Sequence, residues 1–307
     1  MQGRVFKSTG SWYLVYSSDG APYQCRLRGK FKIKGLKVTN PLSVGDNVIF
    51  EIEDSDNRTA IITEILPKKN YIIRKSIKNP NQGHILASNL DQSILMVTLA
   101  LPRTSTGFID RFLVTAESFR IPAVLLFNKE DLMDEQQIND QVALAEIYEA
   151  LNYECHLISA LTESGIHEFN EILQGKTSLL AGHSGVGKST LINKIIPHAQ
   201  QPTAEISDFA EKGVHTTTFA EMFEINPTTF IIDTPGIKEL GLLEIGSEEL
   251  SHYFPEMREL FGACKFYNCT HLHEPGCAVK DAVASLEIAP SRYRSYLSMM
   301  ENEDNRR

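Results

Sequence analysis

The clearest indication of the fold is a glycine-rich stretch in the second half of the chain, Gly182-His183-Ser184-Gly185-Val186-Gly187-Lys188-Ser189. It fits the pattern G-x4-G-K-[S/T], follows an apolar segment expected to be a strand (177–181) and opens a segment with helical character (187–196). In that context the glycines let backbone N–H groups curl around phosphates, and the helix N-terminus adds partial positive charge. We expect Lys188 to reach the β- and γ-phosphates and the Ser189 hydroxyl to bind Mg2+, with Thr190 beside it in the nucleotide-binding loop.

A second loop motif follows the apolar segment 229–232 and runs Asp233-Thr234-Pro235-Gly236. The pattern D-x-x-G occurs by chance about once in a chain of this size, so it carries weight only because it follows an expected strand downstream of a phosphate loop. We expect Asp233 to lie near Mg2+, through a water molecule, and the Gly236 N–H to meet the γ-phosphate.

The segment between these two loops, 202–218, is polar and ends in Gly213-Val214-His215-Thr216-Thr217-Thr218. A nucleotide switch needs a threonine here whose hydroxyl and carbonyl close over Mg2+ and the γ-phosphate. We expect Thr217 to do so, with Thr216 as the second choice. The alternative is that the three threonines only begin a strand.

Two motifs upstream of the phosphate loop are suited to recognising a guanine base. Asn128-Lys129-Glu130-Asp131 follows an apolar segment, and Ser159-Ala160-Leu161 follows the next expected strand. The Asp131 carboxylate can accept from the guanine N1–H and exocyclic amine, a pair of donors that adenine lacks. Lys129 can lay its stem over the base, and Asn128 can tie this loop to the phosphate loop. The backbone at Ser159 and Ala160 can meet guanine O6, so GTP is favoured over ATP.

The order of the motifs is circularly permuted, because the base-reading loops precede the phosphate loop. From about residue 85, expected strands and helices alternate, which predicts a parallel sheet covered by helices on both faces. The sheet can close if the original termini were joined near 163–176, since permutation is tolerated where termini lie close together. The predicted fold class is α/β, with a permuted P-loop GTPase core at 85–244.

The N-terminal part, 1–66, contains short β-like segments bounded by Gly, Pro, Asp or Asn, which predict a small barrel of the OB type or, alternatively, of the SH3 type. The segments are Arg4–Lys7, Trp12–Tyr16, Tyr23–Leu27, Asn47–Ile52 and Thr59–Ile65. Residues 67–84 are polar and basic, and we interpret them as a linker.

The charge of the chain is unevenly distributed. The formal net charge is −9, yet residues 1–38 hold eight lysines and arginines against one aspartate, Asp19. A basic arm on an acidic chain indicates a local site for a phosphate backbone, and a solvated basic face of a small β domain is the alternative. Trp12 and Tyr13 are candidates for stacking on bases or for the barrel core.

A cysteine–histidine cluster lies in the C-terminal zone, 245–307, which is expected to be helical. Cys264-x4-Cys269-x-His271-x5-Cys277 supplies three thiolates and one imidazole, a set that suits structural Zn2+ without an open position for catalysis. His273 is a competing ligand, and unrelated buried cysteines are the alternative. Five cysteines are too few for a disulfide scaffold. No export signal or membrane-length apolar run is evident, so we expect a reducing cytoplasm and no membrane partner.

The succession N-K-x-D, S-A, G-x4-G-K-S, G-x-H-T-T-T, D-T-P-G and C-x4-C-x-H-x5-C resembles the ribosome small-subunit-dependent GTPase A family over nearly the whole chain. The resemblance implies an OB-fold N-terminal domain, a permuted GTPase core and a C-terminal zinc domain. It also implies GTPase activity stimulated by the small ribosomal subunit, a role in late 30S maturation and contact with 16S rRNA. We further expect a monomer. Val214 departs from the pattern, where a basic residue is expected, and this puts the charge of the switch in doubt.

Three functions compete: a GTP-hydrolysing timer on ribosomal RNA that forms GDP and phosphate, a nucleotide-gated binding module, and a nucleic-acid chaperone with a vestigial site. The complete motif set disfavours the last, because a vestigial site should have lost Lys188 or Asp131. Many GTPases orient the attacking water with a glutamine just after D-x-x-G, but Ile237 stands there. We expect His215 to take that role, with a ribosomal group as the alternative.

Overall fold

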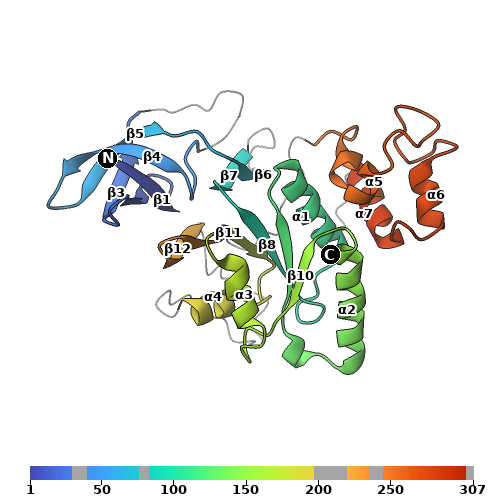
Figure 1. Cartoon of the computed structure of the whole chain (residues 1–307). Coiled ribbons are helices and arrows are strands. Elements are labelled where there is room, and N and C mark those ends of the chain that lie inside the picture. Colours follow the sequence, from blue (N-terminus) through green and yellow to red (C-terminus); the bar gives the residue numbers. More distant parts are fainter. Residues whose placement is uncertain (30–39, 76–82, 197–219, 235–244, 302–307) are drawn as a thin grey trace.

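The computed structural model describes residues 1–29, 40–75, 83–196, 220–234 and 245–301. A small β-barrel, a central sheet with helices and a C-terminal helical module follow one another along the chain (Figure 1). Among the described helices, none is long and apolar enough to cross a bilayer.

The N-terminal barrel closes on itself. Strand β1 pairs with both β2 and β4, and the order β1-β2-β3-β5-β4 returns to β1. All its pairs are antiparallel except β3–β5. This strand order, closed through β1–β4 and with β3–β5 as its parallel pair, confirms the predicted OB barrel. The strands are β1 (Gln2–Ser8), β2 (Tyr13–Ser17), β3 (Pro22–Leu27), β4 (Asn47–Asp54) and β5 (Thr59–Ile65).

The central sheet has the order β10-β9-β8-β11-β13-β12. Its strands are β8 (Gln92–Val97), β9 (Ala123–Phe127), β10 (Glu154–Leu157), β11 (Thr177–Gly182), β12 (Glu221–Asn226) and β13 (Thr229–Asp233). Only β12 runs antiparallel to its neighbour, and it is also the strand that meets β1 of the barrel. The strands before the base-reading loops, β9 and β10, precede the central β11 in sequence, so the permuted order is built into one continuous sheet.

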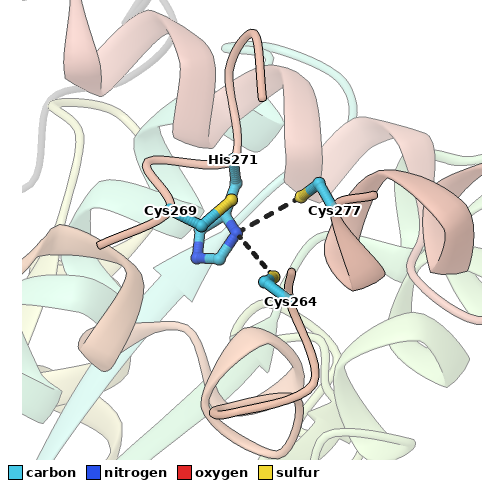
Figure 2. Close-up of side chains that lie close together, drawn as sticks. All are labelled: Cys264, Cys269, His271 and Cys277. Atoms are coloured by element: carbon cyan, nitrogen blue, oxygen red, sulfur yellow. Dashed lines mark hydrogen bonds between the residues drawn. The ribbon is translucent and has the colours of Figure 1, made fainter. Parts of the chain in front are cut away.

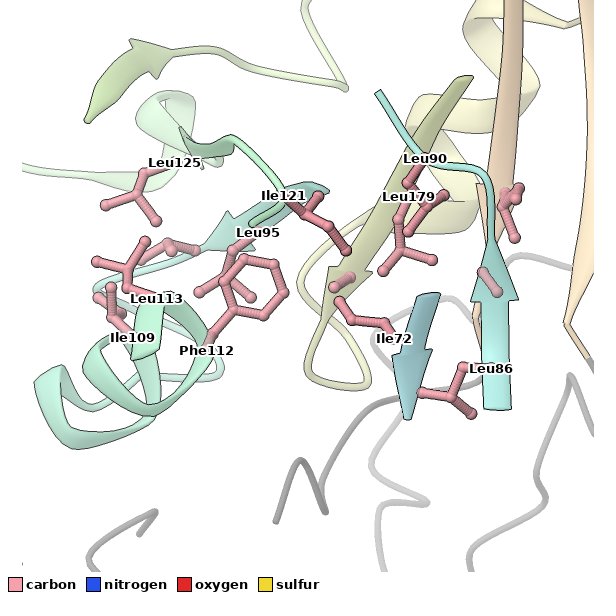
Figure 3. Close-up of a cluster of buried hydrophobic side chains, with 14 of the residues drawn as sticks. Ile72, Leu86, Leu90, Leu95, Ile109, Phe112, Leu113, Ile121, Leu125 and Leu179 are labelled. Atoms are coloured by element: carbon pink, nitrogen blue, oxygen red, sulfur yellow. The ribbon is translucent and has the colours of Figure 1, made fainter. Parts of the chain in front are cut away.

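Helices cover both faces of this sheet, and alternate residues of each strand point to opposite faces. Leu95, Leu125 and Leu179 pack with α1 and α2, whereas Ile94, Val124 and Leu180 pack with α3 and α4. Figure 3 shows the first cluster, with Phe112 of α1 against the sheet. The helices are α1 (Thr106–Ser118), α2 (Glu135–Glu149), α3 (Ile166–Leu173) and α4 (Lys188–Ile195).

The stretch interpreted as a linker, 67–84, contains regular structure. Strands β6 (Tyr71–Lys75) and β7 (Gly83–Ser88) pair in an antiparallel two-stranded sheet. Buried Asp46 from the barrel accepts hydrogen bonds from Ser88 and Lys68, and Gly45 sits against β7, where a Cβ atom would come within 2.2 Å of the Ser88 carbonyl oxygen. The barrel is therefore packed directly onto the segment that leads into the core.

The C-terminal module packs on α1 through a buried ion network. It contains η2 (Leu250–Tyr253), α5 (Pro255–Arg258), α6 (Ala278–Ala284) and α7 (Pro290–Met300). The guanidinium of Arg292 contacts Asp110 of α1 at 2.6 Å and Glu256 at 2.8 Å, and Tyr148 donates to Asp110 at 2.9 Å. Burial raises the pKa of Asp110, while Arg292 opposes that effect. The module is thus attached to a helix of the core through charged groups that are almost wholly buried.

Candidate functional site

The loops that carry the expected nucleotide motifs meet at one edge of the central sheet. Strand β9 ends just before Asn128, β10 ends two residues before Ser159, β11 ends at Gly182 and β13 ends at Asp233. These four strands are parallel, so their carboxyl ends lie along the same edge. Ligands of open α/β sheets bind at that edge.

Asn128 joins three of these loops. Its Nδ2 donates to the Val186 carbonyl at 2.7 Å, and its Oδ1 accepts from the Ala160 N–H at 2.9 Å. Gly187 makes this approach possible, because its φ is +106° and a Cβ there would lie 2.4 Å from Asn128 Nδ2. The phosphate loop and both base-reading loops are therefore held as one unit.

The carboxylate expected to recognise guanine is exposed at this edge. The Ser159 hydroxyl donates to Asp131 Oδ1 and accepts from the Thr162 N–H at 3.1 Å, which fixes the orientation of the carboxylate. The amino group of Lys129 donates to the Leu101 carbonyl, so its stem lies across the loop that follows β8. The Ala160 N–H, expected at guanine O6, already donates to Asn128, and a base carbonyl has to share that donor.

Lys188 and Asp233 are charged groups at the end of the site that is expected to bind phosphate. Lys188 Nζ donates to the carbonyls of Gly182 and His183 at 2.8 and 3.0 Å. Burial lowers the pKa of Lys188, and Asp233 opposes this. Burial raises the pKa of Asp233 to about 6, with Lys188 acting against it and Glu221 adding to it. The two groups therefore influence each other electrostatically.

Asp233 also offers an unused oxygen. The residue is 2 % exposed, and its Oδ1 is buried without a hydrogen-bond partner among the described residues. Mg2+ keeps several waters and is held by one or two oxygen ligands together with phosphates. A buried carboxylate oxygen that needs a partner fits that requirement, because a water of the cation can donate to it. Ser189, the other expected ligand in the described region, lies in the first turn of α4.

Three expected site residues lie outside the described residues: His215, Thr217 and Gly236. Sequence reasoning also missed contacts within the described part. Phe108 of α1 packs on the phosphate-loop residue His183 with ring centroids 3.9 Å apart. Glu221 lies opposite Asp233 on β12. Neither residue belongs to a motif, so only the register of the strands and the packing of α1 reveal them.

The four expected metal ligands come together in the C-terminal module. The ligand atoms of Cys264, Cys269, His271 and Cys277 all lie within 4.8 Å of one another. Figure 2 shows the His271 ring among the three sulfur atoms, with Nδ1 at 3.7 Å from Cys264 Sγ and 3.4 Å from Cys277 Sγ. Burial lowers the pKa of His271, which favours the neutral imidazole that binds metals. His273, the competing residue, is exposed outside the cluster.

The basic arm is only partly described, and its described members have partners. Arg26 pairs with Glu53 at 2.7 Å, and Arg28 lies 3.4 Å from Glu51, both on the barrel surface. Lys30, Lys32, Lys34 and Lys37 lie outside the described residues. Of the two aromatic candidates, Tyr13 is buried in the barrel core and Trp12 is 42 % exposed. Trp12 alone is thus available for stacking.

This fold and this site define a class: a GTP-binding hydrolase whose sheet carries the nucleotide motifs in circularly permuted order. Two protein families whose sequences match this chain agree with this class. The RsgA N-terminal domain family matches residues 2–62, and the RsgA GTPase family matches residues 65–243. The chain belongs to the RsgA GTPase family, and its reaction is the hydrolysis of GTP.

Curated relatives match over the full length. The small ribosomal subunit biogenesis GTPase RsgA of Cytophaga hutchinsonii is 56 % identical, covering 100 % of both chains. The protein of the same name from Phocaeicola vulgatus is 51 % identical, covering 99 % of this chain and 97 % of its own. Among solved structures, YjeQ from Thermotoga maritima matches with a TM-score of 0.76 and 37 % identity, covering 100 % of this chain and 99 % of its own. YloQ, described as a circularly permuted GTPase, matches with a TM-score of 0.72 and 31 % identity, covering 100 % and 96 %.

Proposed function

We propose that this GTPase acts in the biogenesis of the small ribosomal subunit, as the names of its full-length relatives state for those proteins. The more specific proposal is that GTP turnover is stimulated by the small subunit and times a late step of its maturation. The observation that carries the enzymatic part is the joining of the phosphate loop and both base-reading loops by Asn128.

At the phosphate end, Lys188 neutralises charge on the β- and γ-phosphates. Ser189 would bind the magnesium ion directly and Asp233 through one of its waters, with Thr217 as the further ligand. When bound, Mg2+ supplies positive charge that offsets the charge of the transferring phosphoryl group. At the base end, Asp131 accepts from guanine N1–H and the exocyclic amine, and its orientation is supported by Ser159.

Water activation is assigned to His215. Its neutral imidazole can accept a proton from water, and the usual pKa of histidine suits that task near neutral pH. A group from the ribosome is the competing candidate. His215→Ala should remove most of the stimulated turnover and preserve GTP affinity and subunit binding, whereas Lys188→Ala should lose nucleotide binding as well.

The metal of the C-terminal module is proposed to be one structural Zn2+. Three thiolates and one imidazole match the ligand preference of zinc, and Zn–S and Zn–N bonds of about 2.3 and 2.0 Å around a tetrahedral centre agree with separations of 3.4 and 3.7 Å. Tyr293 of α7 donates to the carbonyl of His271 at 2.6 Å. The ligand loop thereby supports the helix that carries Arg292.

The proposed division of labour follows the three parts of the chain. The OB barrel (1–66) contacts 16S rRNA, the core (85–244) binds and hydrolyses GTP, and the zinc-binding helical module (245–307) packs on α1 of the core. Exposed Trp12 supports the first assignment, because a base can stack on it. We place this monomer in the cytoplasm, where ribosomal subunits mature.

The test is multiple-turnover GTP hydrolysis with and without purified small subunits. We expect small subunits to raise turnover by at least ten-fold and purified large subunits to leave it unchanged. Lys188→Ala serves as the inactive control and corrects for contaminating GTPases. Equal turnover with both kinds of subunit contradicts the proposed partner, even if the core hydrolyses GTP.

A further inference from the structure

Three charged side chains form a row across neighbouring strands at the nucleotide end of the sheet. Lys7 on β1 is the register partner of Glu221 on β12, and Glu221 is the register partner of Asp233 on β13. Lys7 Nζ lies 3.0 and 2.9 Å from the two carboxylate oxygens of Glu221. Residues directly opposite in an antiparallel pair have Cβ atoms about 4.5–5.5 Å apart and share a face. Only Glu221 therefore separates a lysine of the barrel from Asp233 along this row.

The charges in this row matter because the site binds polyphosphate. The positive charge of Lys188 in the phosphate loop lowers the pKa of Asp233, whereas the negative charge of Glu221 on the adjacent strand raises it. Without Lys7, Glu221 is an uncompensated negative charge beside a carboxylate that faces an anionic ligand. The side chains of Lys7 and Glu221 are 40 % and 27 % exposed, so water screens the pair only in part.

The strand that carries Lys7 is fixed independently of that lysine. Arg4, three residues earlier on β1, donates to the Thr177 hydroxyl at 3.0 Å, and its guanidinium lies 5.0 Å from the centre of the Phe230 ring. Thr177 begins β11, and Phe230 lies near the start of β13. Replacing Lys7 therefore removes a charge from the row and leaves this second attachment of the barrel in place.

We propose that Lys7 is a positioning residue that the barrel supplies to the nucleotide site: by neutralising Glu221 next to Asp233, it favours binding of the magnesium nucleotide. Since coupling between two equilibria is reciprocal, nucleotide binding favours the docked barrel by the same factor. The inference rests on the proposed assignment of Asp233 to the magnesium nucleotide.

A double-mutant cycle tests it in the full-length protein. Lys7→Ala should raise the Kd for a non-hydrolysable GTP analogue and for GDP, both with Mg2+, by about two- to five-fold, the effect of a partly exposed charge pair. Glu221→Gln in the Lys7→Ala background should restore the affinity, because it removes the uncompensated charge. The loss in Lys7→Ala should shrink at high salt. Arg26→Ala, which breaks a barrel ion pair remote from this row, is the matched control and should leave both Kd values unchanged.

The other possible results of this experiment contradict the proposal. If the double variant binds as weakly as Lys7→Ala, Lys7 acts only by attaching the barrel, and the electrostatic inference is wrong. It is also wrong if Lys7→Ala binds like the parent protein while Asp233→Asn binds weakly. If Asp233→Asn also leaves the affinity unchanged, the assignment of Asp233 to the nucleotide fails as well.

Discussion

Replacing the carboxylate of Asp233 by an amide should stabilise the nucleotide-free protein while weakening its affinity for the magnesium nucleotide. The reason is the environment of the side chain. Asp233 is 2 % exposed, one of its oxygens lacks a hydrogen-bond partner among the described residues, and Glu221 lies opposite it. Asparagine keeps the shape and removes the buried charge, so function and stability should change in opposite directions.

The magnitude follows from the pKa, which burial raises from 3.8 to about 6. A carboxyl group whose pKa is higher in the folded than in the unfolded state does not lower the free energy of unfolding at a pH below both pKa values, because it is protonated in each state. The cost grows as the pH rises from about 4 to about 6 and is constant above that range. The upward shift of the Asp233 pKa lowers the free energy of unfolding by about 3 kcal/mol at pH 8 and by about 1 kcal/mol at pH 4.5.

Differential scanning calorimetry of protein freed of nucleotide by phosphatase treatment and dialysed into magnesium-free buffer measures this effect. Asp233→Asn should raise the Tm of the core by roughly 6–12 °C at pH 8 and by much less at pH 4.5. Asp131→Asn is the matched control, because Asp131 is exposed and its loss should change stability by less than about 0.5 kcal/mol. An equal gain at both pH values, or no gain at pH 8, refutes the reasoning.

Three further predictions concern the base, the metal and the buried ion network. Asp131→Asn should weaken GTP binding strongly and favour xanthine nucleotide; equal ATP and GTP affinity in the parent protein contradicts this. The purified protein should contain about one Zn2+ per chain by atomic absorption, and His271→Ala should lose more of it than His273→Ala; full retention in the His271 variant shows that the ligand is wrong. Arg292→Met leaves buried Asp110 without its cation and should cost about 3–5 kcal/mol in urea unfolding, and a loss below about 1 kcal/mol argues against the network.

Much of the fold could be predicted from the sequence, because its strands are apolar runs bounded by turn residues. The segments Thr59–Ile65 and Ala123–Phe127 form strands with the predicted bounds. The pair β6–β7 was missed, because β6 and the first two residues of β7 lie in the polar, basic stretch that was interpreted as a linker. The antiparallel direction of β12 was also missed, because direction depends on pairing and not on composition.

In the candidate site, too, some residues could be predicted from the sequence and others could not. Phosphate-loop, base-reading and cysteine residues stand at fixed spacings, so their chemistry can be predicted before their positions are known. The sequence already favoured His271 over His273, and the fold agrees with that choice, because it buries His271 beside the three cysteines and exposes His273. Lys7 and Glu221 are 214 residues apart and share no motif, so their pairing is visible only through strand register.

The permuted order of the sheet also has a consequence for synthesis on the translating ribosome. Strands β8, β9 and β10 and the base-reading loops emerge before β11, which fills the centre of the finished sheet. Roughly fifty residues separate Asn128 from Gly182, which amounts to about 3–10 s at common elongation rates. During that interval the inner edge of β8 lacks its partner and Asn128 lacks the Val186 carbonyl. The nascent core can thus form the loops proposed to recognise guanine early, whereas the proposed phosphate loop is complete only after the chain has passed β11.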